Sequence, residues 1–109
     1  MPLDWINLMV LLQNRFANPG GFALTNHARQ RRSQRNISIE DIINCVFTGT
    51  IIEEQAHSED PKVLIHGLKK DGTAFYIVVA LTDYKPVVVT VCTLDEDAWE
   101  VIAGIPHRK

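Results

Sequence analysis

The feature that most restricts the fold is a change of hydrophobic periodicity at Thr50. Before this residue, apolar side chains recur with the three- and four-residue spacing of helices. After it, four short segments rich in β-branched residues follow one another, as strands joined by hairpins do. Helices followed by strands predict an α+β fold, with N-terminal helices packed on a four-stranded antiparallel β-meander. The expected strands are Thr50–Gln55, Lys62–Leu68, Ala74–Leu81 and Pro86–Thr93.

Capping signals mark where the helices begin. Thr25 or Asn26 is a suitable N-cap for the second helix, and Ser38 with Asp41 forms a variant of the capping box for the third. The tail, Asp95–Gly104, is expected to form a short closing helix or turn. The three expected helices are Leu3–Phe16, Asn26–Arg35 and Ile39–Phe47.

Length and composition indicate one small globular protein of 109 residues. We divide it into an apolar helix and linker over 1–21 and an α+β domain over 22–109. The apolar run Leu8–Leu12 is too short to span a membrane, so we expect a cytoplasmic protein with no membrane partner. Cys45 and Cys92 lie in apolar contexts without metal-ligand spacing. We therefore expect reduced, buried thiols, no metal site and no cofactor.

The first helix carries more apolar surface than one buried face requires. Residues of its main apolar stripe are joined by Ile6, Val10 and Leu11 on the other side. A helix that is apolar over most of its circumference favours burial on two faces. We predict that one face belongs to the core and that Leu3–Phe16 also forms a homodimer contact. The main stripe consists of Trp5, Leu8, Met9, Leu12 and Phe16.

The charge of the chain is distributed unevenly. The segment 26–37 holds four arginines and no acid, whereas 38–60 holds six acids and no lysine or arginine. In a helix, His27, Arg31 and Arg35 occupy positions i, i+4 and i+8 and lie along one side. Arginines beside an imidazole suit a phosphate ligand and proton transfer. The net charge of −2 argues against general electrostatic coating of nucleic acid.

Two interpretations of this arginine row remain open at this point. In the first, the row faces RNA: His27 supplies an acid or base, and Arg31 and Arg35 clamp the phosphate. In the second, Arg31 and Arg35 form ion pairs with Glu53 and Glu54 on the first strand of the meander and lock helix to sheet.

The pattern Thr25-x-His27-Ala-Arg-Gln-Arg31-x-x-Gln-Arg35-x-Ile37-Ser38 resembles a bacterial family, domain of unknown function 4258. The later matches are Gly67-x-x-x-Asp71-Gly72, Ile77-Val-Val-Ala80 and Val87-Val-Val-Thr90-Val91, so the resemblance covers roughly residues 22–99.

Two positions depart from the family pattern. Asn36 stands where the family has Gly, and Asn tolerates the left-handed conformation that such a turn uses. Arg32 stands where the family has an apolar residue, which predicts that this side of the helix is exposed.

The resemblance implies a small toxin of a toxin–antitoxin module, neutralised by a zinc-finger antitoxin and similar in fold to RelE-like ribonucleases. We therefore expect a metal-independent endoribonuclease acting through His27, Arg31 and Arg35. His66 is the best candidate for the second acid or base that RNA cleavage requires, and Tyr76 and Tyr84 are weaker candidates. The alternatives are a non-catalytic dimeric module that binds protein or nucleic acid, and a structural domain held by an internal Arg–Glu network.

Overall fold

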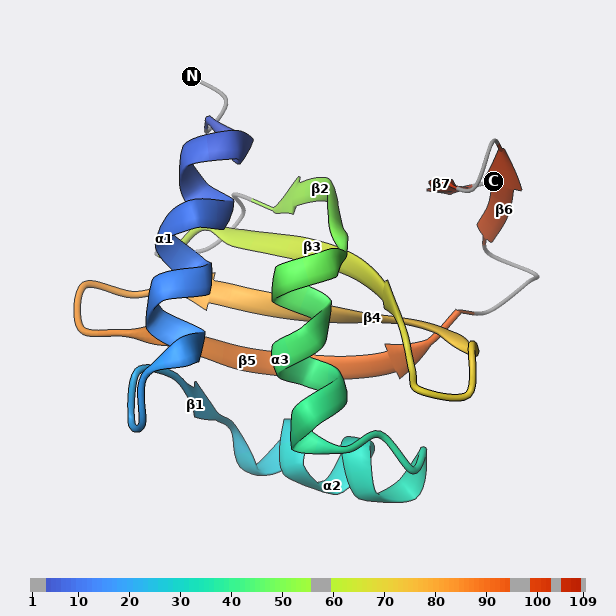
Figure 1. The fold of residues 1–109 in the computed structure, drawn as a ribbon, viewed down its shortest axis with the longest axis horizontal. Coiled ribbons are helices and arrows are strands. Elements are labelled where there is room, and N and C mark those ends of the chain that lie inside the picture. Colours follow the sequence, from blue (N-terminus) through green and yellow to red (C-terminus); the bar gives the residue numbers. More distant parts are fainter. Residues whose placement is uncertain (1–3, 56–59, 95–98, 103–104, 109) are drawn as a thin grey trace.

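The computed structural model describes residues 4–55, 60–94, 99–102 and 105–108. Three helices precede the four long strands of a sheet, a two-residue strand of the same sheet lies between the first two helices, and a separate two-stranded hairpin follows (Figure 1). The helices are α1 (Trp5–Ala17), α2 (Asn26–Gln34) and α3 (Ile39–Thr48). The strands are β1 (Ala23–Leu24), β2 (Thr50–Gln55), β3 (Lys62–Leu68), β4 (Ala74–Leu81), β5 (Pro86–Thr93), β6 (Trp99–Ile102) and β7 (Ile105–Arg108).

Side-chain caps fix the start of each helix. The carboxylate of Asp4 accepts the first amides of α1, and the Thr25 hydroxyl accepts the Ala28 amide of α2. The Ser38–Asp41 capping box is confirmed, because each side chain accepts the backbone N–H of the other. The predicted helix boundaries are therefore correct to within about two residues, which is the usual uncertainty of helix ends.

The antiparallel meander from β2 to β5 is confirmed, with the predicted boundaries for all four strands. The predicted sheet is nevertheless incomplete. The two residues of β1 add a fifth strand that runs parallel to β5, in the order β1-β5-β4-β3-β2. The sheet is mixed because residues 23–24 pair with the outer edge of β5 before the chain enters α2. Two residues are too few for a strand period to appear in the sequence.

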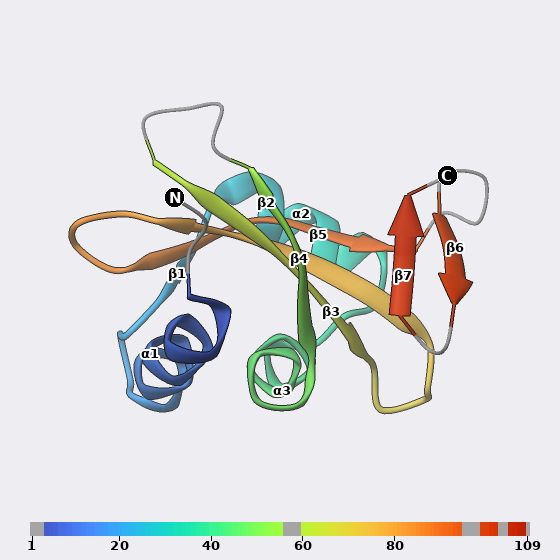
Figure 2. The ribbon, with the colours of Figure 1, turned by 90° about the horizontal axis from the view of Figure 1, so that it is seen from above.

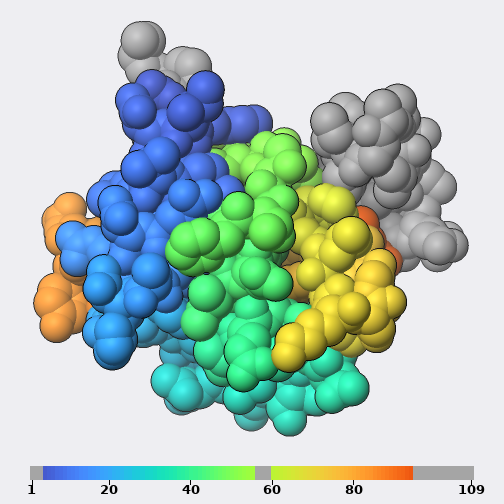
Figure 3. Space-filling model, viewed as in Figure 1, coloured from blue at the N-terminus to red at the C-terminus, as the bar shows by residue number. Residues whose placement is uncertain are grey.

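The core lies between the sheet and one layer of helices. Figure 2 shows α1 and α3 side by side on one face of the sheet, with α2 near the level of the sheet, and Figure 3 shows α1 and α3 adjacent on the surface of that face. Alternate residues of each central strand point into this core, as the two-residue period of a strand requires. Its members include Leu12 and Phe16 from α1, Ile42 and Val46 from α3, and Val63, Ile65, Phe75, Ile77, Val79, Val88 and Val91 from the strands.

The opposite face of the sheet, which we call the outer face, has a smaller apolar cluster. Leu64 and Val78 form its buried centre, and Ile52, Tyr76 and Val89 pack around them. These residues alternate along the strands with the residues that face α1 and α3. The outer face is therefore half apolar, and its remaining positions are occupied by polar side chains.

The prediction for the C-terminal segment was wrong where the structure describes it. Residues 99–102 and 105–108 form the antiparallel hairpin β6–β7 instead of a helix. The β-branched pair in Trp99–Ile102 favours a strand once a partner strand is available. Residues 95–98 and 103–104 of the predicted segment lie outside the described residues.

Candidate functional site

Helix α2 is held against the edge of β5. The Thr25 amide donates to the Val88 carbonyl at 3.0 Å, and the Thr25 hydroxyl donates to the Val89 carbonyl at 3.3 Å. From there α2 runs alongside β5 in the same direction (Figure 1). Arg31 lies six residues after Thr25. At about 1.5 Å per helical residue and about 3.3 Å per strand residue, this places Arg31 beside Val91 and Cys92.

The two flanks of α2 face different sides of the sheet. Ala28 is fully buried and marks the side of α2 that contacts the sheet. Arg32 lies on one flank and donates from Nη1 to the Ile37 carbonyl at 3.3 Å, on the side that leads into α3. At 100° per residue, Arg31 and His27 lie on the other flank of Ala28. Arg31 therefore lies at the border of the outer face.

His27, Arg31 and Arg35 differ in their exposure to solvent. His27 is exposed in the first turn of α2, whereas Arg31 and Arg35 are half-buried. Nη1 of Arg35 is buried and has no hydrogen-bond partner among the described residues, and the same holds for Nε of Arg32. The prediction that Arg32 is exposed was therefore wrong, because its side chain folds back to cap the α2–α3 connection.

The position of α2 excludes the predicted ion pairs of Arg31 and Arg35 with Glu53 and Glu54. Helix α2 lies beside β5, whereas Glu53 and Glu54 lie on β2, three strands away at the opposite edge of the sheet. Three strand spacings amount to about 14 Å before the offset of the helix is added. Glu54 instead accepts a hydrogen bond from the Trp5 indole, and Glu53 accepts one from the Gln55 amide at 2.9 Å.

A row of candidate site residues crosses the outer face. The registers of the sheet pair Thr50 with His66, His66 with Tyr76, and Tyr76 with Cys92. These residues alternate with core residues such as Ile65, so their side chains face away from α1 and α3. The row ends at β5, level with Arg31. From the registers and the helical rise we infer that His66, Tyr76 and Arg31 share one surface, whereas His27 lies four residues further back along α2, about 6 Å.

His66 also lines a hollow of about 300 Å³ at the edge of the sheet, with Thr48, Gly49, Thr50, Gly67 and Leu68. This volume is at the lower end of small-molecule sites. Burial lowers the pKa of His66 below its ordinary value, so the imidazole is neutral near pH 7. A neutral imidazole can accept a proton.

Two glycines allow α3 to approach the sheet at this hollow. A Cβ on Gly49 would lie 2.3 Å from the His66 carbonyl oxygen, and one on Gly67 would lie 2.7 Å from Sγ of Cys45. The Cys45 thiol is fully buried beneath this contact, and burial raises its pKa to about 12. Cys92 differs from the prediction of two buried thiols, because it is half-buried on the outer face.

The residue types predict His66 as a site residue, with Tyr76 and Tyr84 as weaker candidates. The register of β3 with β4 is the signal that distinguishes the two tyrosines: Tyr76 is the direct partner of His66, whereas Tyr84 lies in the β4–β5 turn and is 81% exposed. His57 lies outside the described residues. Within the described part of the chain, no group of three or more His, Cys, Asp or Glu side chains is placed to hold a metal ion.

Comparison with known families identifies the central part of the chain. Residues 24–93, from β1 to the end of β5, match the family described as domain of unknown function (DUF4258). The chain belongs to this family. The match includes α2, α3 and the whole meander, so the Thr25–Ser38 pattern and the later motifs up to Val91 lie inside it, whereas α1 lies outside. No curated protein and no solved structure matches the chain. None of the described helices is long and apolar enough to cross a membrane.

Proposed function

We propose that the outer face binds single-stranded RNA and that the protein is a metal-independent endoribonuclease of the toxin type. One relationship carries this proposal: the cross-strand row His66–Tyr76–Cys92 ends at β5, where the rise of α2 is expected to bring Arg31 alongside. An imidazole, a phenol and a guanidinium on one surface provide proton transfer, stacking and phosphate binding together. In the toxin setting that the family resemblance suggests, a zinc-finger antitoxin would neutralise this protein.

In the proposed reaction, neutral His66 takes the proton of an RNA 2′-hydroxyl. The 2′-oxygen then attacks the adjacent phosphorus, the bond from phosphorus to the 5′-oxygen breaks, and a 2′,3′-cyclic phosphate forms. A second group must protonate the departing 5′-oxygen, and the Tyr76 phenol is the neighbouring candidate. Arg31 stabilises the negative charge that develops on the phosphate oxygens.

Arg35 and His27 are assigned supporting roles in this proposal. Nη1 of Arg35 is buried without a hydrogen-bond partner among the described residues, and the helix dipole stabilises the positive charge of Arg35 at the C-terminal end of α2. His27 is exposed at the far end of the same flank and is placed to contact a phosphate further along the strand.

Cleavage of a labelled single-stranded RNA by the purified protein tests the proposal. His66→Gln should lower the rate about 10²–10⁴-fold, as removal of a general acid or base does. Arg31→Gln should lower it about 10²–10³-fold. The matched control is Arg29→Gln, which removes the same charge from an exposed position of the same helix. Equal losses in the Arg29 and Arg31 variants, or full activity of His66→Gln, would refute the assignment.

A second candidate function is RNA binding without cleavage. The distance across the row favours it, because His66 and Cys92 are two strand spacings apart, about 10 Å. A row of that length suits several nucleotides of a bound strand better than one reacting phosphate. In this case the Arg31 variant should bind RNA more weakly while the wild-type protein leaves RNA intact.

A further inference from the structure

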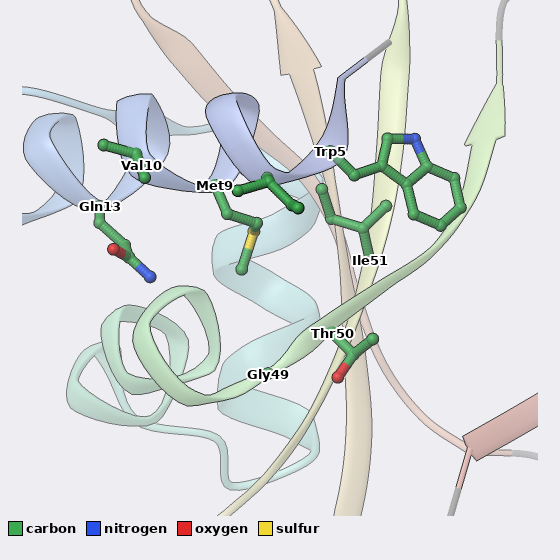
Figure 4. Close-up of a pocket in the computed structure, with 8 residues that line it drawn as sticks. Trp5, Met9, Val10, Gln13, Gly49, Thr50 and Ile51 are labelled. Atoms are coloured by element: carbon green, nitrogen blue, oxygen red, sulfur yellow. The ribbon is translucent and has the colours of Figure 1, made fainter. Parts of the chain in front are cut away.

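The hollow beside His66 has a lining that no step of the proposed reaction uses. It encloses about 300 Å³ at the edge of the sheet, where α3 ends and β2 begins. Figure 4 shows two of its lining residues, Gly49 and Thr50, at this junction. Among the described residues, no lysine, arginine, aspartate or glutamate lines the hollow. Because a charged group is costly to bury without a partner, we expect an uncharged occupant.

The polar groups around the hollow favour hydrogen-bond donors. The last turn of α3 ends here, and the C-terminal end of a helix carries a negative partial charge that repels anions. The Thr48 hydroxyl already donates to the Asn44 carbonyl at 2.8 Å, so its oxygen remains available only as an acceptor. Thr50 is exposed, and its hydroxyl forms no hydrogen bond within the described part of the chain. An N–H group of the occupant would therefore be bound more favourably than a phosphate oxygen.

One side of the hollow is apolar. Leu68 lines it and is 55% exposed. It follows His66 by two residues on β3, so both side chains point to the outer face. A planar ring held in the hollow would cover Leu68, in the way that apolar side chains cover a base removed from its stack.

An uncharged planar ring with hydrogen-bond donors is a nucleobase. The hollow adjoins His66, which the proposed function places at an RNA 2′-hydroxyl, and this further inference rests on that function. We propose that the hollow binds the base of the nucleotide whose 2′-hydroxyl His66 activates. Adenine and cytosine present an amino group as donor, whereas uracil has a carbonyl oxygen at the same position. The hollow should therefore prefer adenine or cytosine to uracil.

Titration with nucleosides tests the base site without the phosphate-binding and cleavage steps. The full-length ¹⁵N-labelled protein would be titrated with cytidine and, separately, with uridine, neither of which carries a phosphate. Cytidine should shift the amide signals of Thr50 and Leu68 saturably at millimolar concentration. Uridine should bind about three-fold or more weakly, which is the effect of one hydrogen bond.

Two substitutions test the location of this site. Thr50→Phe fills the hollow with a residue that strands favour, and it should weaken cytidine binding about ten-fold or more. Leu68→Ser removes apolar surface without filling the hollow and should weaken binding about three-fold. The matched control is Thr93→Phe, which introduces the same side chain at an exposed threonine at the end of β5 and should leave cytidine binding unchanged.

The base site and the proposed function can fail separately. Unchanged cytidine binding in Thr50→Phe, equal binding of the two nucleosides, or no saturable shifts with millimolar cytidine would overturn the base site. RNA cleavage that depends on Arg31 would still support the proposed function in that case. Selective cytidine binding at Thr50 in a protein that leaves RNA intact would instead support the base site and reject the ribonuclease.

Discussion

His66 and Tyr76 are direct cross-strand partners on β3 and β4, and both side chains face away from the helices that cover the core. The neighbours of His66 along the strand, Ile65 and Gly67, contact that core instead. Because successive side chains of a strand point to opposite faces of the sheet, one set forms the core and the other set forms the proposed site. Substitution of His66 should consequently affect function more than packing, whereas substitution of Tyr76 should also disturb the apolar cluster around Leu64 and Val78.

Protein stability should depend on pH through His66. Its pKa is lowered in the folded protein by burial, so between that pKa and about 6.5 the unfolded chain binds more protons than the folded chain. The free energy of unfolding should therefore fall as the pH decreases below about 6.5. His66→Gln should reduce this slope in urea unfolding measured from about pH 5 to 7. Identical slopes in the two proteins would contradict the assigned pKa shift.

Gly67→Ala should destabilise the fold by about 1–3 kcal/mol, the usual cost of an overpacked core. The added Cβ would lie 2.7 Å from Sγ of Cys45. Adding Cys45→Ala should recover most of the loss, because it removes the clashing sulfur. Gly72→Ala is the comparison: its Cβ meets nothing within 4 Å, but its φ of +87° is unfavourable for alanine. If urea unfolding shows that the stability losses of Gly67→Ala and Cys45→Ala simply add in the double variant, the contact with Sγ of Cys45 does not cause the destabilisation.

Asp41→Ala should cost about 2–4 kcal/mol of stability, since two backbone donors lose a charged acceptor. Asp41 is 5% exposed and accepts the Ser38 amide and the Lys70 amide, both at 3.1 Å. It thus joins the start of α3 to the β3–β4 turn. Glu40→Ala is the control, because Glu40 only forms an exposed ion pair with Lys70, and such pairs contribute about 0–1 kcal/mol. The prediction fails when chemical denaturation gives equal losses for the two variants.

The two thiols should differ in reactivity. Cys45 is fully buried with a pKa of about 12, so little thiolate forms and a thiol reagent should reach it only on unfolding. Cys92 is half-buried on the outer face and should react first in the native protein. Bound RNA should slow that reaction, whereas labelling of Cys45 in denaturant should not change. Mass spectrometry of the labelled protein distinguishes the sites, and early labelling of Cys45 would be the contrary result.

The sequence was sufficient to predict the elements that have strong local signals. The capping box Ser38–Asp41 and the turn at Asn36, whose φ is +56°, follow from the chemistry of single residues. The sequence was not sufficient to predict β1, because a two-residue strand forms only by pairing with the edge of β5. It also failed for Arg32, because no local pattern predicts that its side chain reaches back to the Ile37 carbonyl.

The candidate site could be predicted only in part for the same reason. The residue types of His66 and Arg31 mark them as candidates, but their placement on one surface depends on strand register and on the flank of α2 that faces the outer side. His27 belongs to the sequence motif, yet the geometry separates it from His66. Tyr76 belongs to the candidate site solely because it is the cross-strand partner of His66.

Mapping the RNA-binding surface by NMR tests the central claim most directly. Backbone amide signals of the ¹⁵N-labelled protein would be followed while a short single-stranded RNA is added at low salt. The largest shifts are expected at His66, Tyr76, Cys92 and Arg31, and they should weaken as salt is added. Shifts confined to α1 and α3, or no shifts at millimolar RNA, would contradict it.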